Sequence, residues 1–240
     1  MTNPRIPARA EILVIVPAFN EATSVGRVVE EILESGERVE VLVIDDGSTD
    51  ATAAAARAVG ARVLRLAFNC GIGAGVQAGL RVGVAEGHAF VARIDGDGQH
   101  DPAVLPELIA PLRAGRADFS IGSRYVTGEG YQSTAVRRAG TRWFSILLGL
   151  ACRLNVVDPT SGCWAANPRA AALLAAESSS DYPEVDSLVR LARNGCSIVE
   201  VPTIMRPRSM GRSSIGGLHA LYYMIKVTIA LLVGRVRPRA

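Results

Sequence analysis

The densest group of potentially reactive side chains in the sequence is the run Asp95-Gly96-Asp97-Gly98-Gln99. Two carboxylates two residues apart, followed by an amide oxygen, form a compact set of the oxygen ligands that hard divalent cations prefer. Such a set leaves coordination positions open for the oxygens of a bound phosphate. The cation then neutralises charge on a leaving diphosphate. The run therefore predicts a magnesium or manganese site at which a diphosphate binds.

Polar clusters also follow two other predicted strands. In an open α/β sheet, ligands bind at the edge where the carboxyl ends of the strands meet, so these clusters are expected to converge there. Any one cluster could equally serve as a turn or a helix cap. The three pairs of strand and cluster are Glu11–Pro17 with Asn20-Glu21, Val39–Asp45 with Asp45-Asp46 and Asp50, and Phe90–Asp95 with Asp95, Asp97 and Asp101.

The elements that must position these residues alternate between strand and helix over the first half of the sequence. This alternation predicts a mostly parallel α/β sheet with right-handed crossovers. Ser24 is the expected N-cap of the first helix, and Gly60 ends the second. The predicted strands are Glu11–Pro17, Val39–Asp45, Arg62–Leu66, Phe90–Asp95 and Asp118–Ser123, and the predicted helices are Val25–Leu33, Ala51–Val59, Gly71–Ala85 and Pro102–Ala114.

The pattern changes after Ser123. We expect a long polar loop and an apolar helix whose Trp143, Phe144, Leu147, Leu148 and Leu150 belong either to the core or to a membrane contact. Glu184 and Asp186 are interpreted as surface or capping residues, with a position near the active site as the alternative. The predicted elements are the loop Arg124–Ala135, the helices Val136–Leu154 and Leu188–Ala192, the strand Cys196–Ile204 and the basic loop Arg206–Gly217.

Composition excludes several classes of protein. The formal net charge of +3 is too small to argue for nucleic-acid binding. Four widely spaced cysteines indicate free thiols in a reducing compartment. The first eleven residues contain no signal peptide, and the longest apolar stretch, Leu218–Val233, falls short of the roughly 20 residues that span a bilayer. We therefore expect a cytoplasmic protein.

Two other enzyme classes place similar motifs after a strand. Phosphatases with an aspartate nucleophile use a DxD run together with a lysine, but the single lysine here is Lys226, in an apolar segment. Dinucleotide-binding folds need GxGxxG after the first strand. The glycines Gly71, Gly73 and Gly75 follow the third predicted strand and have a different spacing. Both readings are therefore disfavoured.

The order of the motifs resembles glycosyltransferase family 2, and within it the dolichol-phosphate mannose synthase and polyprenyl-phosphate glycosyltransferase branch. The resemblance covers about residues 11–216. The motifs that carry it are Val16-Pro17-Ala18-Phe19-Asn20-Glu21, Asp45-Asp46-Gly47-Ser48-Thr49-Asp50, Asn69 to Gly75, Asp95-Gly96-Asp97-Gly98-Gln99-His100, Gly122-Ser123-Arg124-Tyr125, Asp158-Pro159-Thr160-Ser161-Gly162-Cys163 and Arg208-Ser209-Met210-Gly211-Arg212-Ser213.

The resemblance implies a GT-A fold, a nucleotide-diphosphate sugar as donor and a divalent metal, Mg²⁺ or Mn²⁺. It implies that Arg124 and Arg208 bind phosphate groups, for which a forked guanidinium is suited. Asp158 matches the position proposed for the base, although an ionised phosphate acceptor needs none. The remaining implied roles are nucleoside binding by Pro17, Phe19, Glu21, Ile44 and Asp46, diphosphate binding by Asp95, Gly96 and Asp97, and metal binding by Asp97, Gln99 and Asp95.

The sequence predicts an inverting glycosyltransferase that uses a UDP- or GDP-linked sugar. Polyprenyl phosphate at the membrane surface is the leading acceptor, and a soluble sugar or natural product is the alternative acceptor. A protein that binds a nucleotide sugar without catalysis is the alternative from a different functional class. Ser214 and Asn69 stand where the branch usually has basic residues. Residues 1–217 are expected to form the catalytic domain, and residues 218–240 an apolar helix with a basic tail that meets the membrane or forms a homodimer.

Overall fold

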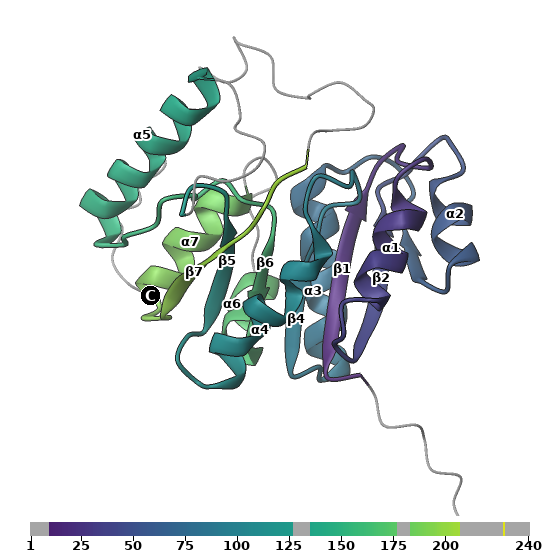
Figure 1. Ribbon diagram of the computed structural model, residues 1–240, viewed down its shortest axis with the longest axis horizontal. Helices are drawn as coiled ribbons and strands as arrows, with labels where there is room; N and C mark the ends of the chain where they lie inside the picture. Colours follow the sequence, from purple (N-terminus) through teal and green to yellow (C-terminus); the bar gives the residue numbers. More distant parts are fainter. Residues whose placement is uncertain (1–9, 127–134, 177–182, 207–227, 229–240) are drawn as a thin grey trace, which may run out of the picture.

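The computed structural model describes residues 10–126, 135–176, 183–206 and 228. Its centre is a seven-stranded sheet in the order β3-β2-β1-β4-β6-β5-β7 (Figure 1). Six strands run parallel and β6 alone is antiparallel to both of its neighbours. The strands are β1 Ile12–Ala18, β2 Val39–Asp45, β3 Arg62–Arg65, β4 Phe90–Arg93, β5 Phe119–Ser123, β6 Trp164–Ala166 and β7 Ile198–Pro202.

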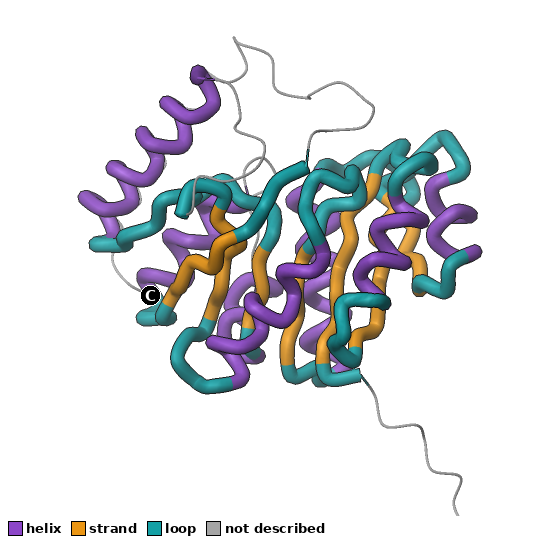
Figure 2. The backbone as a smooth tube through the Cα atoms, in the orientation of Figure 1, coloured by secondary structure: helices purple, strands orange, loops and turns teal. Residues whose placement is uncertain are grey.

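Helices cover both faces of this sheet, so the fold has three layers (Figure 2). One hydrophobic cluster joins the sheet to α1, α2 and α4, and the other joins it to α3, α5, α6 and α7. Alternate residues of β1 divide between the two clusters, as expected for a strand buried on both faces. The helices are α1 Val25–Leu33, α2 Thr52–Ala58, α3 Ile72–Glu86, α4 Leu105–Arg113, α5 Ala135–Cys152, α6 Pro168–Ala176 and α7 Pro183–Arg193.

The strands and helices predicted for residues 11–123 are confirmed, and most of their ends lie within one or two residues of the predicted ends. The helix expected over Pro102–Ala114 begins instead as a 3₁₀ turn, Pro102–Val104, in front of α4. Ser24 occupies the N-cap position of α1 as expected, but its hydroxyl makes no capping bond and instead donates to the carbonyl oxygen of Gly96 at 2.8 Å. Ser24 therefore ties the start of α1 to the Asp95 run.

Two glycines in the second half of the third helix have a packing role. In α3, a Cβ on Gly79 would lie 2.7 Å from Ile15 Cγ2, and one on Gly83 would lie 2.5 Å from Val91 Cγ2. These glycines allow the helix to lie close against β1 and β4. They explain why this segment is rich in glycine and apolar without being a dinucleotide fingerprint.

Two elements of the second half were not predicted. Strand β6 has only three residues, and it enters the sheet between β4 and β5 with the opposite direction. Helix α6 follows it, and α7 begins five residues before the predicted Leu188. Because β6 is antiparallel, the residues that precede it, Asp158–Cys163, arrive at the same edge as the carboxyl ends of the parallel strands.

Candidate active site

The Asp95 run leaves β4 at the edge of the sheet and forms a tight turn. Asp95, Asp97 and Gln99 are partly exposed, whereas Gly96, Gly98 and His100 between them are buried. The three oxygen-bearing side chains therefore alternate with buried positions and face the open side of the turn. The backbone N–H of Gln99 donates to Asp97 Oδ1 at 3.0 Å, which closes the turn.

This arrangement fits a divalent cation that completes its coordination with ligand oxygens. Within the described residues there is no group of three His, Cys, Asp or Glu side chains that could hold a metal by themselves. Two carboxylates and one amide supply only part of a coordination shell. The donor set is thus suited to magnesium or manganese together with a diphosphate.

His100 lies beneath this turn. It is 4% exposed, and its Nδ1 accepts a hydrogen bond from the backbone N–H of Asp95 at 3.5 Å. Burial lowers the pKa of His100 despite the nearby charges of Asp95 and Asp97, with Arg124 and Arg93 contributing in the same direction as burial. The neutral imidazole therefore supports the turn from inside.

The loops after β1 and β2 are bonded directly to each other. The backbone N–H of Asn20 donates to the Ser48 hydroxyl at 2.9 Å, and Asn20 Oδ1 accepts from the backbone N–H of Thr49 at 2.9 Å. Asn20 itself has a positive φ of 55°, which asparagine tolerates better than most residues. The two clusters that follow the first two strands therefore form one surface.

The predicted nucleoside-binding residues lie along this surface and differ in exposure. Phe19 is 43% exposed and Glu21 is partly exposed, whereas Pro17 and Ile44 are buried. Asp46 is also buried, and its two oxygens accept from the backbone N–H groups of Cys70 at 2.7 Å and Gly71 at 2.9 Å. Asp46 thus fixes the loop that leads into α3, beside the rim formed by Phe19 and Glu21.

Arg124 and Asp158 form a buried ion pair at the end of β5. Arg124 Nε donates to Asp158 Oδ2 at 2.6 Å and Nη2 donates to Oδ1 at 2.5 Å. Asp158 is 0% exposed and Arg124 is 8% exposed. Burial alone would lower the pKa of Arg124, but the bonds and charge of Asp158 outweigh it and raise that pKa. In this conformation the Asp158 carboxylate is therefore fully engaged by Arg124.

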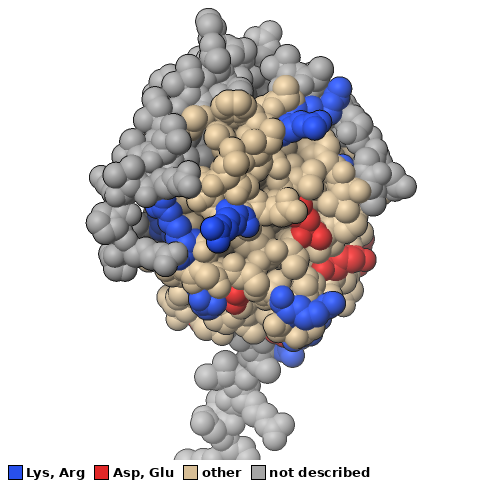
Figure 3. Space-filling view, turned by 90° about the vertical axis from the view of Figure 1, so that its left-hand side faces the viewer, with Lys and Arg blue, Asp and Glu red and all other residues tan. Residues whose placement is uncertain are grey.

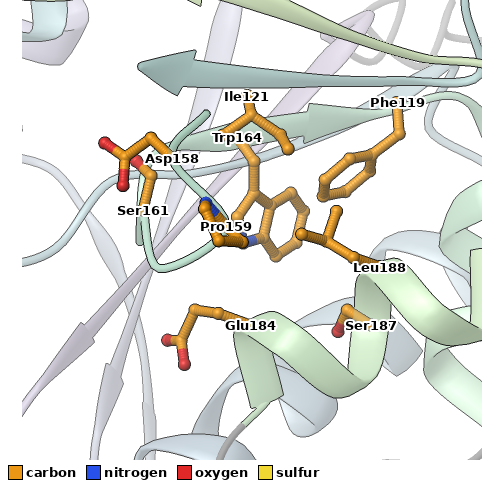
Figure 4. A pocket seen from close by; sticks show the side chains of 9 residues that line it. All are labelled: Phe119, Ile121, Asp158, Pro159, Ser161, Trp164, Glu184, Ser187 and Leu188. Atoms are coloured by element: carbon orange, nitrogen blue, oxygen red, sulfur yellow. The ribbon is translucent and has the colours of Figure 1, made fainter. Parts of the chain in front are cut away.

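Glu200 of β7 holds the turn that carries Asp158. Its two oxygens accept from the backbone N–H groups of Val157 and Asp158, both at 2.8 Å. Beside this turn, a small pocket lies among Asp158, Trp164, Glu184 and six other residues (Figure 4). In that view the carboxylates of Asp158 and Glu184 lie on the same side of the pocket.

Two residues of the site differ from expectation. The interpretation of Glu184 as a surface or capping residue is wrong, because its Oε1 accepts from Nη1 of the buried Arg93 at 2.9 Å. Arg93 was not predicted as part of the site at all. Its only sequence signal is a basic residue inside an otherwise apolar strand. By contrast, Asp186 is a partly exposed residue that pairs with Arg190 at 3.5 Å.

The apolar group on α5 divides between core and surface. Phe144 and Leu148 are buried, Leu147 packs against the core, and Trp143 and Leu150 are exposed. Of the other predicted features, Arg208 and the helix over residues 218–240, except Thr228, lie outside the described residues, as does most of the Arg124–Ala135 loop.

Comparison with known proteins gives the family. The sequence profile of Glycosyl transferase family 2 matches residues 13–172. The chain belongs to this family. It is 31% identical over 238 residues to a polyprenol monophosphomannose synthase of Mycolicibacterium smegmatis, covering 93% of this chain and 88% of the relative. It is 34% identical over 219 residues to an undecaprenyl-phosphate mannosyltransferase of Micrococcus luteus, covering 86% and 88%.

Solved structures of other glycosyltransferases share the fold. The glucosyl-3-phosphoglycerate synthase of Mycobacterium tuberculosis, crystallised with Mn²⁺, UDP and phosphoglyceric acid, matches with a TM-score of 0.71 and 26% identity. The match covers 97% of this chain and 81% of that one. The protein is therefore a family 2 glycosyltransferase with the GT-A fold, as the sequence predicted.

Proposed function

We propose that this protein is a metal-dependent, inverting glycosyltransferase that moves a sugar, mannose first among the candidates, from a UDP- or GDP-linked donor to a polyprenyl phosphate. The strongest support is the similarity along nearly the whole chain to two enzymes named for mannosyl transfer to polyprenyl phosphates. In this proposal Asp95, Asp97 and Gln99 hold Mg²⁺ or Mn²⁺, and the rim with Phe19 and Glu21 receives the nucleoside.

The bound cation would neutralise the negative charge that develops on the leaving nucleoside diphosphate. The residues of the chain position the acceptor for attack on the opposite side of the sugar. A phosphate acceptor is ionised before it binds, so the reaction needs no general base. This agrees with the geometry of Asp158, whose oxygens are both bonded to Arg124. In this role Asp158 orients Arg124, and Arg124 and Arg208 contact phosphate charge.

Helix α5 supports an acceptor that lies at a membrane surface. Trp143, Ile146 and Leu150 are exposed at successive turns of this helix, with Arg142 and Arg153 exposed beside them. Figure 3 views the end of the molecule that carries α5, where basic side chains are spread among uncharged ones and a few acidic side chains lie toward the lower right. No helix in the described part of the chain is long and apolar enough to cross a membrane. We propose peripheral association with an anionic membrane through this helix.

The test is direct transfer from a labelled donor. The protein is incubated with GDP-mannose or UDP-glucose, Mn²⁺ and undecaprenyl phosphate in vesicles that contain anionic lipid, and the lipid fraction is analysed by mass spectrometry. A lipid-linked hexose is the expected product. Its absence with every donor, when a control enzyme forms product in the same vesicles, would contradict the proposed acceptor.

A soluble phosphate acceptor is the second candidate, because the glucosyl-3-phosphoglycerate synthase structures match 97% of this chain. A parallel reaction with 3-phosphoglycerate in place of the lipid distinguishes the two. Transfer to the soluble acceptor alone would favour this candidate. Nucleotide-sugar binding without transfer or hydrolysis would favour the non-catalytic binding protein.

A further inference from the structure

Arg93 is the largest of the fully buried side chains and connects two parts of the site. It is 1% exposed at the end of β4. Its Nε donates to Asp95 Oδ1 at 2.9 Å, and its Nη1 donates to Glu184 Oε1 at 2.9 Å. One guanidinium therefore links the first aspartate of the metal-site turn to the first turn of α7, 91 residues further along the chain.

This guanidinium stays charged although it is buried. Burial alone would lower the pKa of Arg93, but the charges of Asp95 and Glu184 outweigh burial and raise the pKa above its ordinary value. A buried arginine without compensating carboxylates would be costly. The two carboxylates are thus both needed to stabilise Arg93, and each takes one side of its fork.

The packing around the pair leaves it little freedom. A Cβ on Gly162 would overlap Asp95 Oδ2 and would lie 3.1 Å from Arg93 Nη2. The turn before β6 therefore closes over this ion pair, and only glycine leaves room for it. Gly162 prevents Asp95 and Arg93 from moving apart toward the turn before β6. The position of Asp95 therefore depends on how the Arg93 guanidinium divides its hydrogen bonds between Asp95 and Glu184.

The division of the Arg93 hydrogen bonds between Asp95 and Glu184 determines which Asp95 oxygen is available to a ligand. Asp95 Oδ1 is bonded to Arg93, whereas Oδ2 lies 4.0 Å from His100 Nδ1 and accepts no hydrogen bond from the described residues. A guanidinium readily takes both oxygens of a single carboxylate in parallel bonds. Without the Glu184 charge, Arg93 Nη1 would lose its anionic partner and Asp95 would be the one carboxylate left to Arg93 among the described residues. The guanidinium would then be free to turn and to take both Asp95 oxygens.

We propose that Glu184 is a positioning residue for the donor-side metal site: by holding one side of Arg93, it keeps an Asp95 oxygen available to the divalent cation. Glu184 acts through Arg93 and needs no contact with the donor. This inference rests on the proposed function, since it concerns the cation that accompanies the nucleotide. It gives the acceptor-side helix α7 an influence on donor binding.

The chain offers a matched control for the test. Glu184 and Asp186 both stand in the first turn of α7, but the Asp186 side chain is 45% exposed and pairs with Arg190 outside the network. Glu184→Gln and Asp186→Asn each remove one negative charge at similar size. Calorimetric titration with UDP and with GDP, each with and without Mn²⁺, gives the affinity of the wild type and of both variants.

We expect Glu184→Gln to weaken Mn²⁺-dependent nucleotide binding at least fivefold and to leave metal-free binding within twofold. Asp186→Asn should leave both within twofold. Glu184→Asp keeps the charge on a shorter side chain and should weaken Mn²⁺-dependent binding less than Glu184→Gln, by about three- to fourfold, which lies outside the twofold range expected of the control. If Glu184→Gln does not fold, the Glu184→Asp titration decides, and unchanged affinity there overturns the inference.

Other outcomes separate this role from its alternatives. A purely structural residue would lower the unfolding temperature at unchanged affinity, and a general base would lower kcat at unchanged affinity; either result overturns the inference. Equal weakening by Asp186→Asn also overturns it. If the wild type shows no Mn²⁺-dependent binding, the proposed function fails and the inference with it. If the wild type shows Mn²⁺-dependent nucleotide binding and Glu184→Gln binds equally well, only the inference is overturned and the proposed function stands.

Discussion

The two sides of the site hold their carboxylates by different means. On the side of β1 and β2, Asp46 is bonded to the backbone N–H groups of two residues in the loop before α3, and Asp50 accepts from the backbone N–H groups of Thr52 and Ala22. On the side of β5 and α7, Asp158 and Glu184 are bonded to the buried guanidiniums of Arg124 and Arg93.

The difference has an energetic consequence. A carboxylate bonded to backbone amides has partners that no substitution of a side chain removes. A carboxylate paired with a buried arginine depends for its charge compensation on that one side chain, although Asp158 also accepts from the backbone N–H of Arg124 at 3.1 Å. Removing either member of such a pair leaves an uncompensated charge. The side of β5 and α7 should therefore be the more fragile of the two, whereas changes in the exposed turn of the Asp95 run should affect catalysis more than folding.

The largest expected effect on stability comes from separating Arg124 from Asp158. Asp158→Ala leaves the buried Arg124 without its carboxylate and should lower the free energy of unfolding by about 3–5 kcal/mol. Urea denaturation followed by circular dichroism measures this. Replacing both residues by alanine should cost less than Asp158→Ala alone. A loss below about 1 kcal/mol for Asp158→Ala would show that the pair is not the weak point described above.

Substitutions in the Asp95 run, which follows β4 between the two sides, should lower catalytic turnover more than stability. Asp97→Asn keeps the size of the side chain but removes a charge that would hold the cation, so turnover of donor should fall at least about 100-fold, or about 2.7 kcal/mol in activation free energy. The unfolding temperature should change little. Steady-state assays with and without EDTA check this, and full wild-type activity in EDTA would exclude a metal requirement.

A smaller effect is expected where the two sides touch. Gly162→Ala would place a methyl group against Asp95 and Arg93. We expect about 1–3 kcal/mol of lost stability from overpacking, together with weaker Mn²⁺-dependent nucleotide binding. Gly149→Ala on α5 is the control, because its Cβ would meet only Leu154 O at 3.9 Å. Equal unfolding temperatures for the two variants would contradict the close packing at Gly162.

The smallest effect concerns Asp118, which joins the start of β5 to β7 and to Asn167. Partial burial alone would raise the pKa of Asp118, but hydrogen bonds from the Ser197 backbone, Asn167 and the Ser197 hydroxyl outweigh it and lower that pKa. The stabilisation by this carboxylate is therefore complete above its unfolded pKa of about 3.9 and is lost as pH falls through the lower folded pKa.

Asp118→Asn should accordingly cost about 1–2 kcal/mol at pH 7. The difference in unfolding free energy between variant and wild type should shrink as pH falls below about 4, because the carboxylate is then protonated in the unfolded state before it is protonated in the folded state. Denaturation at pH 7 and pH 3 gives both values. A difference that stays constant over this range would show that the charge of Asp118 does not contribute.

The same contrast explains how far the sequence could predict the molecule. The strands and helices up to Ser123 follow from local patterns, because each buried strand is a continuous apolar run and each turn carries its own polar residues. The direction of β6 has no such signal: Trp164–Ala166 is too short for a periodic pattern. The bond between Arg93 and Glu184 spans 91 residues, and only the packing of α7 against the sheet creates it.

The single reversed strand also affects the order in which the chain can fold. Strand β5 pairs only with β6 and β7, both of which come later in the sequence, whereas β1 to β4 pair among themselves. During synthesis, four strands can therefore assemble while β4 keeps one open edge and β5 has no neighbour. An exposed edge of this kind invites pairing with other chains. The nascent protein is thus expected to be most prone to aggregation until the ribosome has released residue 166.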